Sequence, residues 1–195
     1  MPWLLLSAAI LLEVAGTSLA AIPLTFASVM GALFKFRIDL AALLPQIISR
    51  DDGVARLIYE AERLNPNLAV RMRHCERTTT LPSGATIARG DWVGALIAAA
   101  NLDPRVFPKP HLISLDRDIQ KYLLFNEGGS ERECWGRDRV AMAVLKQCVL
   151  SAGRLKGLRR IAGAAGEPIK LLGVAVGLPA RFTQVGPKLP AAPVP

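Results

Sequence analysis

The chain begins with a long apolar stretch and continues with mixed apolar and charged segments. Residues 1–34 contain no Lys or Arg and a single ionisable side chain, Glu13. The apolar run from Trp3 to Ala21 is close to the roughly 20 residues that a helix needs to span a bilayer. Pro23 is expected to end or kink this helix, because its ring blocks the preceding turn. The pattern predicts a membrane segment over residues 1–36, with one span at 3–22 and an interfacial or re-entrant run at 24–36.

A cleaved signal peptide is the alternative for this segment. Ser18-Leu19-Ala20 is similar to a small-x-small cleavage site, which would release the rest of the chain after Ala20. The lack of basic residues before the run and the charge of Glu13 favour an uncleaved anchor. Basic residues flank only the C-terminal side, so the positive-inside rule predicts an outside N-terminus and a cytoplasmic body. The expectation is a single-pass protein of a bacterial inner membrane.

The remainder of the chain is predicted to form a small α+β domain over residues 37–177, mainly helical with one β-hairpin. Helices are predicted over 38–48, 54–64, 92–100, 115–125 and 134–152. Residues 68–81 and 85–89 alternate and are rich in β-branched types, and Pro82-Ser83-Gly84 between them supplies the turn. Residues 178–195, rich in Pro and Ala, are predicted to be disordered. In helix 134–152 the buried face is expected to carry Val140, Val144, Leu145, Cys148 and Val149.

The distribution of charge indicates what the domain binds. All 24 Lys and Arg residues follow the apolar run, and the net charge is +8. An excess of this kind suits anionic lipid or nucleic acid. A cationic amphipathic cluster that would bind a membrane surface consists of Arg154, Lys156, Arg159 and Arg160. Arg71, Arg73 and Arg77 are the best candidates for nucleic-acid contacts, but alternation in a hairpin would expose arginines in any case. We therefore expect the lipid bilayer, and not nucleic acid, as the partner.

The three cysteines, Cys75, Cys134 and Cys148, are widely spaced and form no C-x-x-C or zinc pattern. We interpret them as buried or idle thiols in a reducing compartment. Neither a metal ion nor a cofactor is expected on this evidence.

Glu13 lies in a segment with a family resemblance. Ala9-Ile10-Leu11-Leu12-Glu13-Val14-Ala15-Gly16-Thr17 resembles the first helix of small multidrug resistance transporters, and the likeness covers residues 3–19. It implies that Glu13 binds protons and a cationic substrate, in a homodimer formed through this helix. No later stretch reaches about 18 uninterrupted apolar residues, so the other helices of that family are not expected.

A second resemblance concerns His111 and Asp116. Their H-x4-D spacing resembles the motif of glycerolipid acyltransferases, which implies His111 as the base and Asp116 as the residue that orients it. Phe125-Asn126-Glu127-Gly128 is similar to the acceptor-phosphate motif of that family, but it follows too closely and has Asn126 in place of proline. No P-loop, G-x-G-x-x-G, G-x-S-x-G or H-E-x-x-H motif is present.

The sequence thus predicts a membrane-anchored accessory or scaffolding protein, not an enzyme, whose basic domain lies on the anionic cytoplasmic surface. Two alternatives stay open at this point. One is a cation/proton exchange protein of the small multidrug resistance type that uses Glu13. The other is an enzyme similar to lipid acyltransferases that uses His111 and Asp116.

Overall fold

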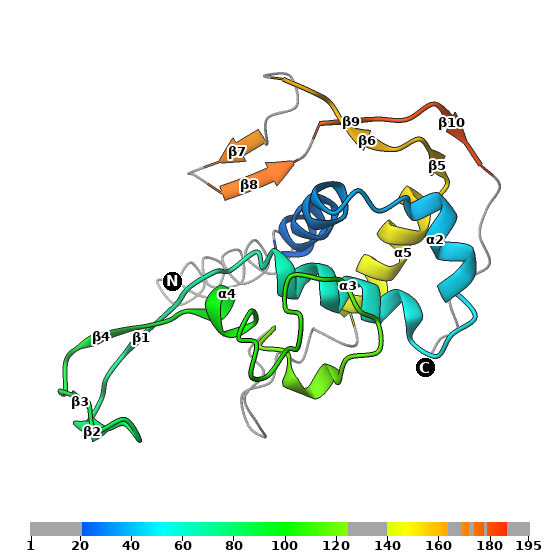
Figure 1. Cartoon of the computed structure of the whole chain (residues 1–195). Coiled ribbons are helices and arrows are strands. Elements are labelled where there is room, and N and C mark those ends of the chain that lie inside the picture. The colour runs from blue at the N-terminus through cyan, green and yellow to red at the C-terminus, as the bar shows by residue number, and fades with distance from the viewer. Residues whose placement is uncertain (1–20, 125–139, 164–168, 172–173, 178, 187–195) are drawn as a thin grey trace, which may run out of the picture.

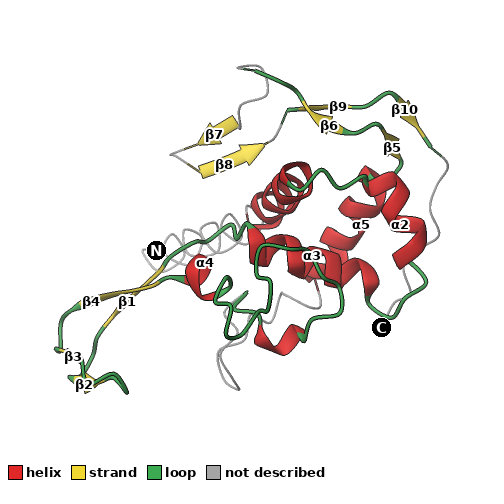
Figure 2. Cartoon of the chain, viewed as in Figure 1, coloured by secondary structure: helices red, strands yellow, loops and turns green. Residues whose placement is uncertain are grey.

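A computed structural model describes residues 21–124, 140–163, 169–171, 174–177 and 179–186. Helices form the body of the molecule and short two-stranded sheets lie at its margins (Figures 1 and 2). Every sheet among the described residues has two antiparallel strands.

Four helices build the core: helix 21–35, α2 (Leu40–Ile47), α3 (Gly53–Leu64) and α5 (Met142–Ala152). The helices predicted over 38–48 and 54–64 are confirmed by α2 and α3. Asp39 caps α2, since its carboxylate accepts from the N–H groups of Ala41 and Ala42 at 3.0 and 3.2 Å. Gly53 allows α3 to start against the end of α2, because a Cβ there would lie 2.2 Å from the Ile47 carbonyl oxygen. Every residue of α3 except Arg56 is buried.

The run over residues 24–36 is part of this core. Val29 and Ala32 of helix 21–35 are completely buried, and Leu33 is 1% exposed. The prediction of an interfacial or re-entrant segment at 24–36 is therefore wrong, because these apolar side chains pack against other helices of the same chain. Within the described ranges, no helix has the length and apolar character needed to cross a membrane. Glu13 and almost all of the predicted span at 3–22 lie outside the described residues, as does the proposed cleavage site.

A long antiparallel ribbon extends away from the helices (Figure 1). Its base pairs β1 (Arg71–His74) with β4 (Trp92–Ala95), and its tip pairs β2 (Thr79–Thr80) with β3 (Thr86–Ile87). The predicted hairpin is confirmed at the tip, where Gly84 has a positive φ of 85° in the turn. The helix predicted over 92–100 is wrong in its first half, because residues 92–95 pair with β1. Only α4 (Ile97–Ala100) is helical.

The segment after α4 has little regular structure. Its one described element is η1, a 3₁₀ turn at Ile119–Lys121. The helix predicted over 115–125 is therefore wrong. Many carbonyl groups of residues 101–118 accept hydrogen bonds from arginine side chains instead of from a helical backbone.

The C-terminal part folds back as paired strands. Its strands are β5 (Leu155–Lys156), β6 (Arg159–Arg160), β7 (Ile169–Leu171), β8 (Val174–Gly177), β9 (Ala180–Arg181) and β10 (Gln184–Val185). β10 pairs with β5 and β9 with β6, so residues 180–185 are ordered where the sequence predicts disorder. The buried residues of α5 are Met142, Leu145, Val149, Leu150 and Ala152, whereas Val140 and Val144 are exposed. Leu145 and Val149 thus belong to the buried face as predicted.

Candidate functional site

A buried ion pair lies at the centre of α3. The side chains of Glu60 and Arg63 are one helical turn apart, and neither is exposed to solvent. Arg63 Nε donates to Glu60 Oε1 at 2.9 Å, and Arg63 Nη2 donates to Glu60 Oε2 at 3.1 Å. Two parallel bonds of this kind fix the relative orientation of the two side chains as well as pairing their charges, because both groups are planar.

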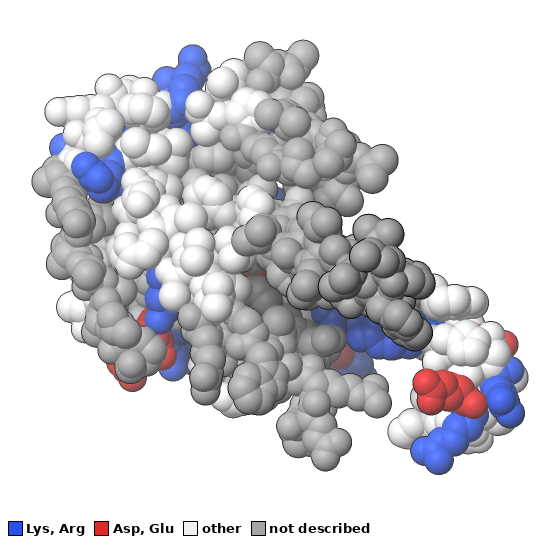
Figure 3. Space-filling view, turned by 180° about the vertical axis from the view of Figure 1, so that it is seen from behind, with Lys and Arg blue, Asp and Glu red and all other residues white. Residues whose placement is uncertain are grey.

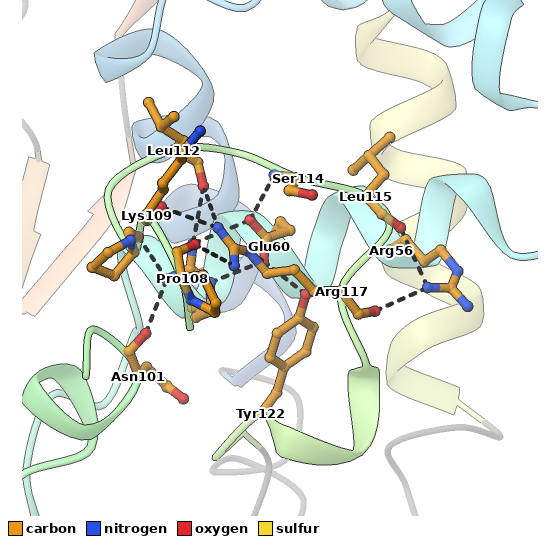
Figure 4. Close-up of polar contacts among 12 residues, drawn as sticks. Arg56, Glu60, Asn101, Pro108, Lys109, Leu112, Ser114, Leu115, Arg117 and Tyr122 are labelled. Carbon is orange, nitrogen blue, oxygen red and sulfur yellow. Dashed lines mark hydrogen bonds and ion pairs between the residues drawn. The ribbon is translucent and has the colours of Figure 1, made fainter. Parts of the chain in front are cut away.

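Glu60 accepts two further hydrogen bonds and forms one further ion pair (Figure 4). The Tyr122 hydroxyl donates to Oε1 at 2.7 Å, and the Ser114 N–H donates to Oε2 at 3.0 Å. Arg117 Nε forms an ion pair with Oε1 at 3.3 Å without hydrogen-bond geometry. Burial, and then the bond to Glu60, raises the pKa of the Tyr122 hydroxyl far above its usual value. Tyr122 is therefore a neutral donor to a fixed carboxylate.

The buried Arg63 and the half-buried Arg117 also hold residues 101–118, which we call the wrapped segment (Figure 4). Arg63 donates to the carbonyls of Asn101 at 2.9 Å, Pro110 at 2.7 Å and Leu112 at 3.2 Å. Arg117 donates to the carbonyls of Pro108 at 2.8 Å, Lys109 at 3.1 Å and Leu112 at 3.3 Å. These bonds satisfy backbone groups that have no partner in a helix or strand, which is why the segment can be both irregular and fixed.

His111 and Asp116 both lie in the wrapped segment, but the structure gives them no joint role. The Asp116 carboxylate pairs with Arg50 at 2.6 Å, and this side chain is 78% exposed. His111 is exposed in a turn. Next to them, Arg56 donates to the carbonyls of Leu115 and Arg117 at 3.3 and 3.1 Å. The H-x4-D spacing therefore belongs to a segment that arginines tie to α3.

The predicted basic cluster is divided between strands and a turn. Lys156 lies in β5, Arg159 and Arg160 lie in β6, and the half-buried Arg154 donates to the Gly186 carbonyl at 3.4 Å. It is not an amphipathic helix. On the face shown in Figure 3, the described Lys and Arg side chains form separate groups, and acidic side chains lie beside basic ones at the tip of the ribbon.

Residues 122–124, which come after the wrapped segment, have alternately buried and exposed side chains. Tyr122 and Leu124 are buried, with 2% and 4% exposure, whereas the Leu123 side chain points outward and is 39% exposed. The buried side chain of Asn101 donates from Nδ2 to the Leu123 carbonyl at 3.2 Å. Its Oδ1 accepts from the Leu123 N–H at 3.0 Å. Residues 125–139, which include Cys134, Phe125-Asn126-Glu127-Gly128 and other glycines, lie outside the described residues.

The other two cysteines occupy different places. Cys75 lies on the ribbon, where its thiol donates to the Arg77 carbonyl at 3.0 Å. Cys148 is half-buried on α5 and lines an open, mostly apolar groove of about 770 Å³ together with Phe26, Val144 and Leu155. In the part of the chain that the structure describes, no three His, Cys, Asp or Glu side chains gather as a metal cluster would require.

Glu62 is a second buried carboxyl of α3, on the side facing helix 21–35. It is 4% exposed, and burial raises its pKa to about 8. Its Oε1 has no hydrogen-bond partner, while Oε2 accepts weakly from the Asn67 N–H at 3.5 Å. Asn67 in turn donates from Nδ2 to Thr25 Oγ1 at 2.7 Å. The junction of α3 with helix 21–35 thus contains a carboxyl that is best accommodated in its neutral form.

Comparisons with known proteins give this arrangement a context. No family model matches the chain. It is 33% identical over 125 residues to Psi-producing oxygenase A of Emericella nidulans, which covers 63% of this chain and 11% of that protein. It is 41% identical over 59 residues to a cytochrome P450 monooxygenase of Aspergillus versicolor, which covers 28% of this chain and 11% of that protein.

Comparison with solved structures gives a similar result. The crystal structure of CYP105D6 superimposes with a TM-score of 0.65 and 25% identity, over 91% of this chain and 45% of that one. CalO2 gives the same TM-score with 27% identity, over 83% of this chain and 40% of that one. The chain resembles part of a cytochrome P450. It spans about a tenth of the length of the curated relatives and less than half of these solved chains.

These findings correct the functional predictions. The relatives are oxygenases and P450 monooxygenases, so the resemblance to small multidrug resistance transporters is wrong. The same likeness overturns the membrane-anchored scaffolding protein, the exchange protein that uses Glu13, the acyltransferase-like enzyme and the single-pass inner-membrane location. The prediction that the chain is not an enzyme is contradicted by the names of its relatives. A homodimer through the N-terminal helix stays a prediction, because residues 3–19 lie outside the described residues.

Sequence reasoning missed the network around Glu60. Its signal was present as Glu60-Ala61-Glu62-Arg63, opposite charges three residues apart on a predicted helix. Such pairs are common on exposed helix faces, and only the burial of α3 shows that this one lies inside the protein. Asn101 carried no sequence signal, because its partner is the main chain of Leu123.

Proposed function

We propose that this chain is part of a P450-type oxidative enzyme and that the thiolate of Cys134 binds its haem. The observation that carries the proposal is the buried network of Glu60, Arg63, Arg117 and Tyr122, set in a fold that resembles solved P450 structures. This network fixes the wrapped segment and the residues that lead toward Cys134. The proposal departs from the expectation that the cysteines are idle and that no cofactor is bound.

The cysteines of the chain are suited to haem to different degrees. P450s hold the haem iron through one cysteine thiolate. Cys75 donates its thiol hydrogen to a backbone carbonyl of the ribbon, and Cys148 faces the groove beside helix 21–35. Cys134 lies in sequence between Leu124 and Met142, which are both buried in the core. Cys75 and Cys148 both have places in the structure that do not suit an iron ligand, and Cys134 is the cysteine whose described flanking residues are buried in the core. Cys134 is therefore the residue that fits the group best.

The role of the described residues would be to support Cys134 as the ligand of the haem iron. When bound, haem supplies the one-electron and oxygen chemistry that amino-acid side chains lack. Cys134 would hold the iron and remain deprotonated. In the Glu60 network, Arg63 and Arg117 donate to backbone carbonyls of the wrapped segment, so its role is to position this backbone. Tyr122 keeps its proton on the hydroxyl that bonds to Glu60, as its raised pKa requires.

Haem binding by single cysteine variants tests the proposal. The full chain, produced with a haem supply, is expected to bind haem and to show the red-shifted ferrous–CO band of thiolate ligation. Cys134→Ser is expected to lose this band, while Cys75→Ser and Cys148→Ser keep it as matched controls. Absence of haem from the wild-type chain, or survival of the thiolate band in Cys134→Ser, would contradict the proposal.

A further inference from the structure

The strands at the C-terminal margin bring two arginines opposite each other. β6 and β9 lie side by side as an antiparallel pair (Figure 1), and in this pair Arg159 is directly opposite Arg181. Side chains directly opposite each other in an antiparallel pair lie on the same face of the sheet, with Cβ atoms about 4.5–5.5 Å apart. The two guanidinium groups therefore share one face of this two-stranded sheet.

Backbone hydrogen bonds fix the strands on both sides of the two arginines. Beyond one end of the pair, the Ile161 N–H donates to the Pro179 carbonyl at 3.2 Å. Beyond the other end, the Thr183 N–H donates to the Lys156 carbonyl at 2.8 Å. The neighbouring Leu158 packs against the hydrophobic core. The two arginines are thus held opposite each other by the strands that carry them.

This arrangement of charge is unfavourable without a partner, because like charges directly opposite each other destabilise a sheet. Both arginines are exposed, and none of the ion pairs between described residues includes either of them. The sequence around them offers little compensation, since residues 154–195 contain seven Lys or Arg residues and one acidic residue, Glu167. An anion bound between the two guanidinium groups would remove the repulsion.

We propose that Arg159 and Arg181 form a binding site for the phosphate group of a ligand. Each guanidinium presents a planar fork of N–H donors that matches the oxygens of a phosphate. A phosphate monoester carries about two negative charges above pH 7, which balance the two arginines, and its oxygens can accept from both forks at once. A carboxylate fits less well, because one guanidinium already pairs with both of its oxygens. The inference does not depend on the proposed haem ligand.

The first test is calorimetric titration of the full chain with inorganic phosphate at constant ionic strength. It compares the wild type with Arg159→Gln, Arg181→Gln and Arg89→Gln. Arg89 is the matched control, because it is also exposed and the change of charge is the same, but it follows β3 at the tip of the ribbon. Loss of either arginine of the pair should weaken phosphate binding by roughly tenfold or more, since it removes charge-assisted hydrogen bonds.

Arg89→Gln should bind phosphate as the wild type does. The inference is overturned if the wild type binds no phosphate, or if both variants of the pair bind it with the wild-type affinity.

Thermal unfolding supplies a second, independent measurement. In phosphate-free buffer, Arg181→Gln is expected to raise the thermal midpoint, because it relieves the repulsion from Arg159. Added phosphate should raise the midpoint of the wild type and of Arg89→Gln but not that of Arg181→Gln, since a ligand stabilises the folded state in proportion to its binding. An equal rise in all three proteins would mean that phosphate acts only as a stabilising salt, and it would overturn the inference.

Vesicles distinguish a soluble phosphorylated ligand from a lipid headgroup as the source of the phosphate. The full chain and Arg181→Gln are sedimented with phosphatidylcholine vesicles, with and without phosphatidic acid. Sedimentation that requires both phosphatidic acid and Arg181 supports the site with a headgroup as its ligand. Titration with inorganic phosphate that requires Arg181, without sedimentation, supports the site with a soluble ligand.

Discussion

The interior around α3 and the ribbon of β1 and β4 differ in how far their side chains are buried. In α3, Glu60 and Arg63 are fully buried and paired, and Ile58 and Leu57 have no exposure. In the ribbon, large apolar side chains remain in water: Trp92 is 70% exposed and Met72 is 52% exposed. Most side chains of the helical interior are therefore buried against other described residues, whereas large side chains of the ribbon are not. We expect mutations in the two regions to differ strongly in their effect on stability.

The largest effect is expected for Glu60→Ala. It leaves Arg63 buried without its carboxylate partner and removes an acceptor from Tyr122 and Ser114. Loss of one partner of a buried pair costs about 3–5 kcal/mol, which is comparable to the total stability of many domains. Urea unfolding followed by circular dichroism should show a greatly weakened or absent transition. The control is Glu76→Ala on the exposed ribbon, and equal stability of the two variants would refute the comparison.

The next largest effect is expected for the pH dependence of the free energy of unfolding, through Glu62. Its folded pKa of about 8 lies above the ordinary value of 4.5, so the folded state binds more protons than the unfolded state between these values. The contribution of Glu62 is therefore present below about pH 4.5 and is lost as pH rises toward 8. Glu62→Gln should remove most of this decline in the free energy of unfolding, measured from pH 5 to 8. Glu76→Gln should leave the decline unchanged, and an unaltered profile in Glu62→Gln would show that this carboxyl is not the cause.

Tyr122→Phe is a more limited change within the same interior. It deletes the hydroxyl that donates to Glu60 at 2.7 Å and keeps the ring that stacks on Phe107 at 5.7 Å. Because a hydrogen bond to a charged group contributes about 1.5–3 kcal/mol, we expect a loss of that size in the free energy of unfolding. A loss below roughly 0.5 kcal/mol, the usual range of surface changes, would mean that other donors replace the hydroxyl.

The smallest effect is expected on the ribbon. Trp92→Ser alters a side chain that is 70% exposed, so the free energy of unfolding should change by no more than about 0.5 kcal/mol. Ile58→Ala in α3 is the paired variant, for which a cavity should cost about 2–5 kcal/mol. Thermal unfolding of both variants checks the contrast. A large loss for Trp92→Ser would show that the ribbon has packing of its own.

Local pattern was enough to predict part of this fold. The helices over α2 and α3 follow from apolar residues at helical spacing, and the turn at Gly84 follows from Pro82-Ser83-Gly84 between β-branched residues. Leu145 and Val149 were assigned correctly to the buried face of α5. These features depend on contacts between residues close in sequence, which a single sequence displays.

The errors arise where distant segments meet. The sequence predicts that residues 92–95 begin a helix, but they form a strand because they pair with β1. The sequence predicts a membrane segment for the apolar run at 24–36, although its buried side chains belong to the same core cluster as those of α3 and α5. Hydrophobicity alone does not distinguish lipid from a protein interior. Residues 180–185 read as disordered and pair with strands of the basic segment.

By itself, the sequence determined the amphipathic helices, the tip of the ribbon and the presence of Glu60, Arg63, Asn101 and Cys134 as residue types. Only the tertiary structure decided that Glu60 and Arg63 are interior groups joined to Tyr122, and that the Asn101 amide holds Leu123. The reason is physical: the spacing of two side chains on a helix is set by its pitch, whereas their burial and their long-range partners are set by which other segments pack over them.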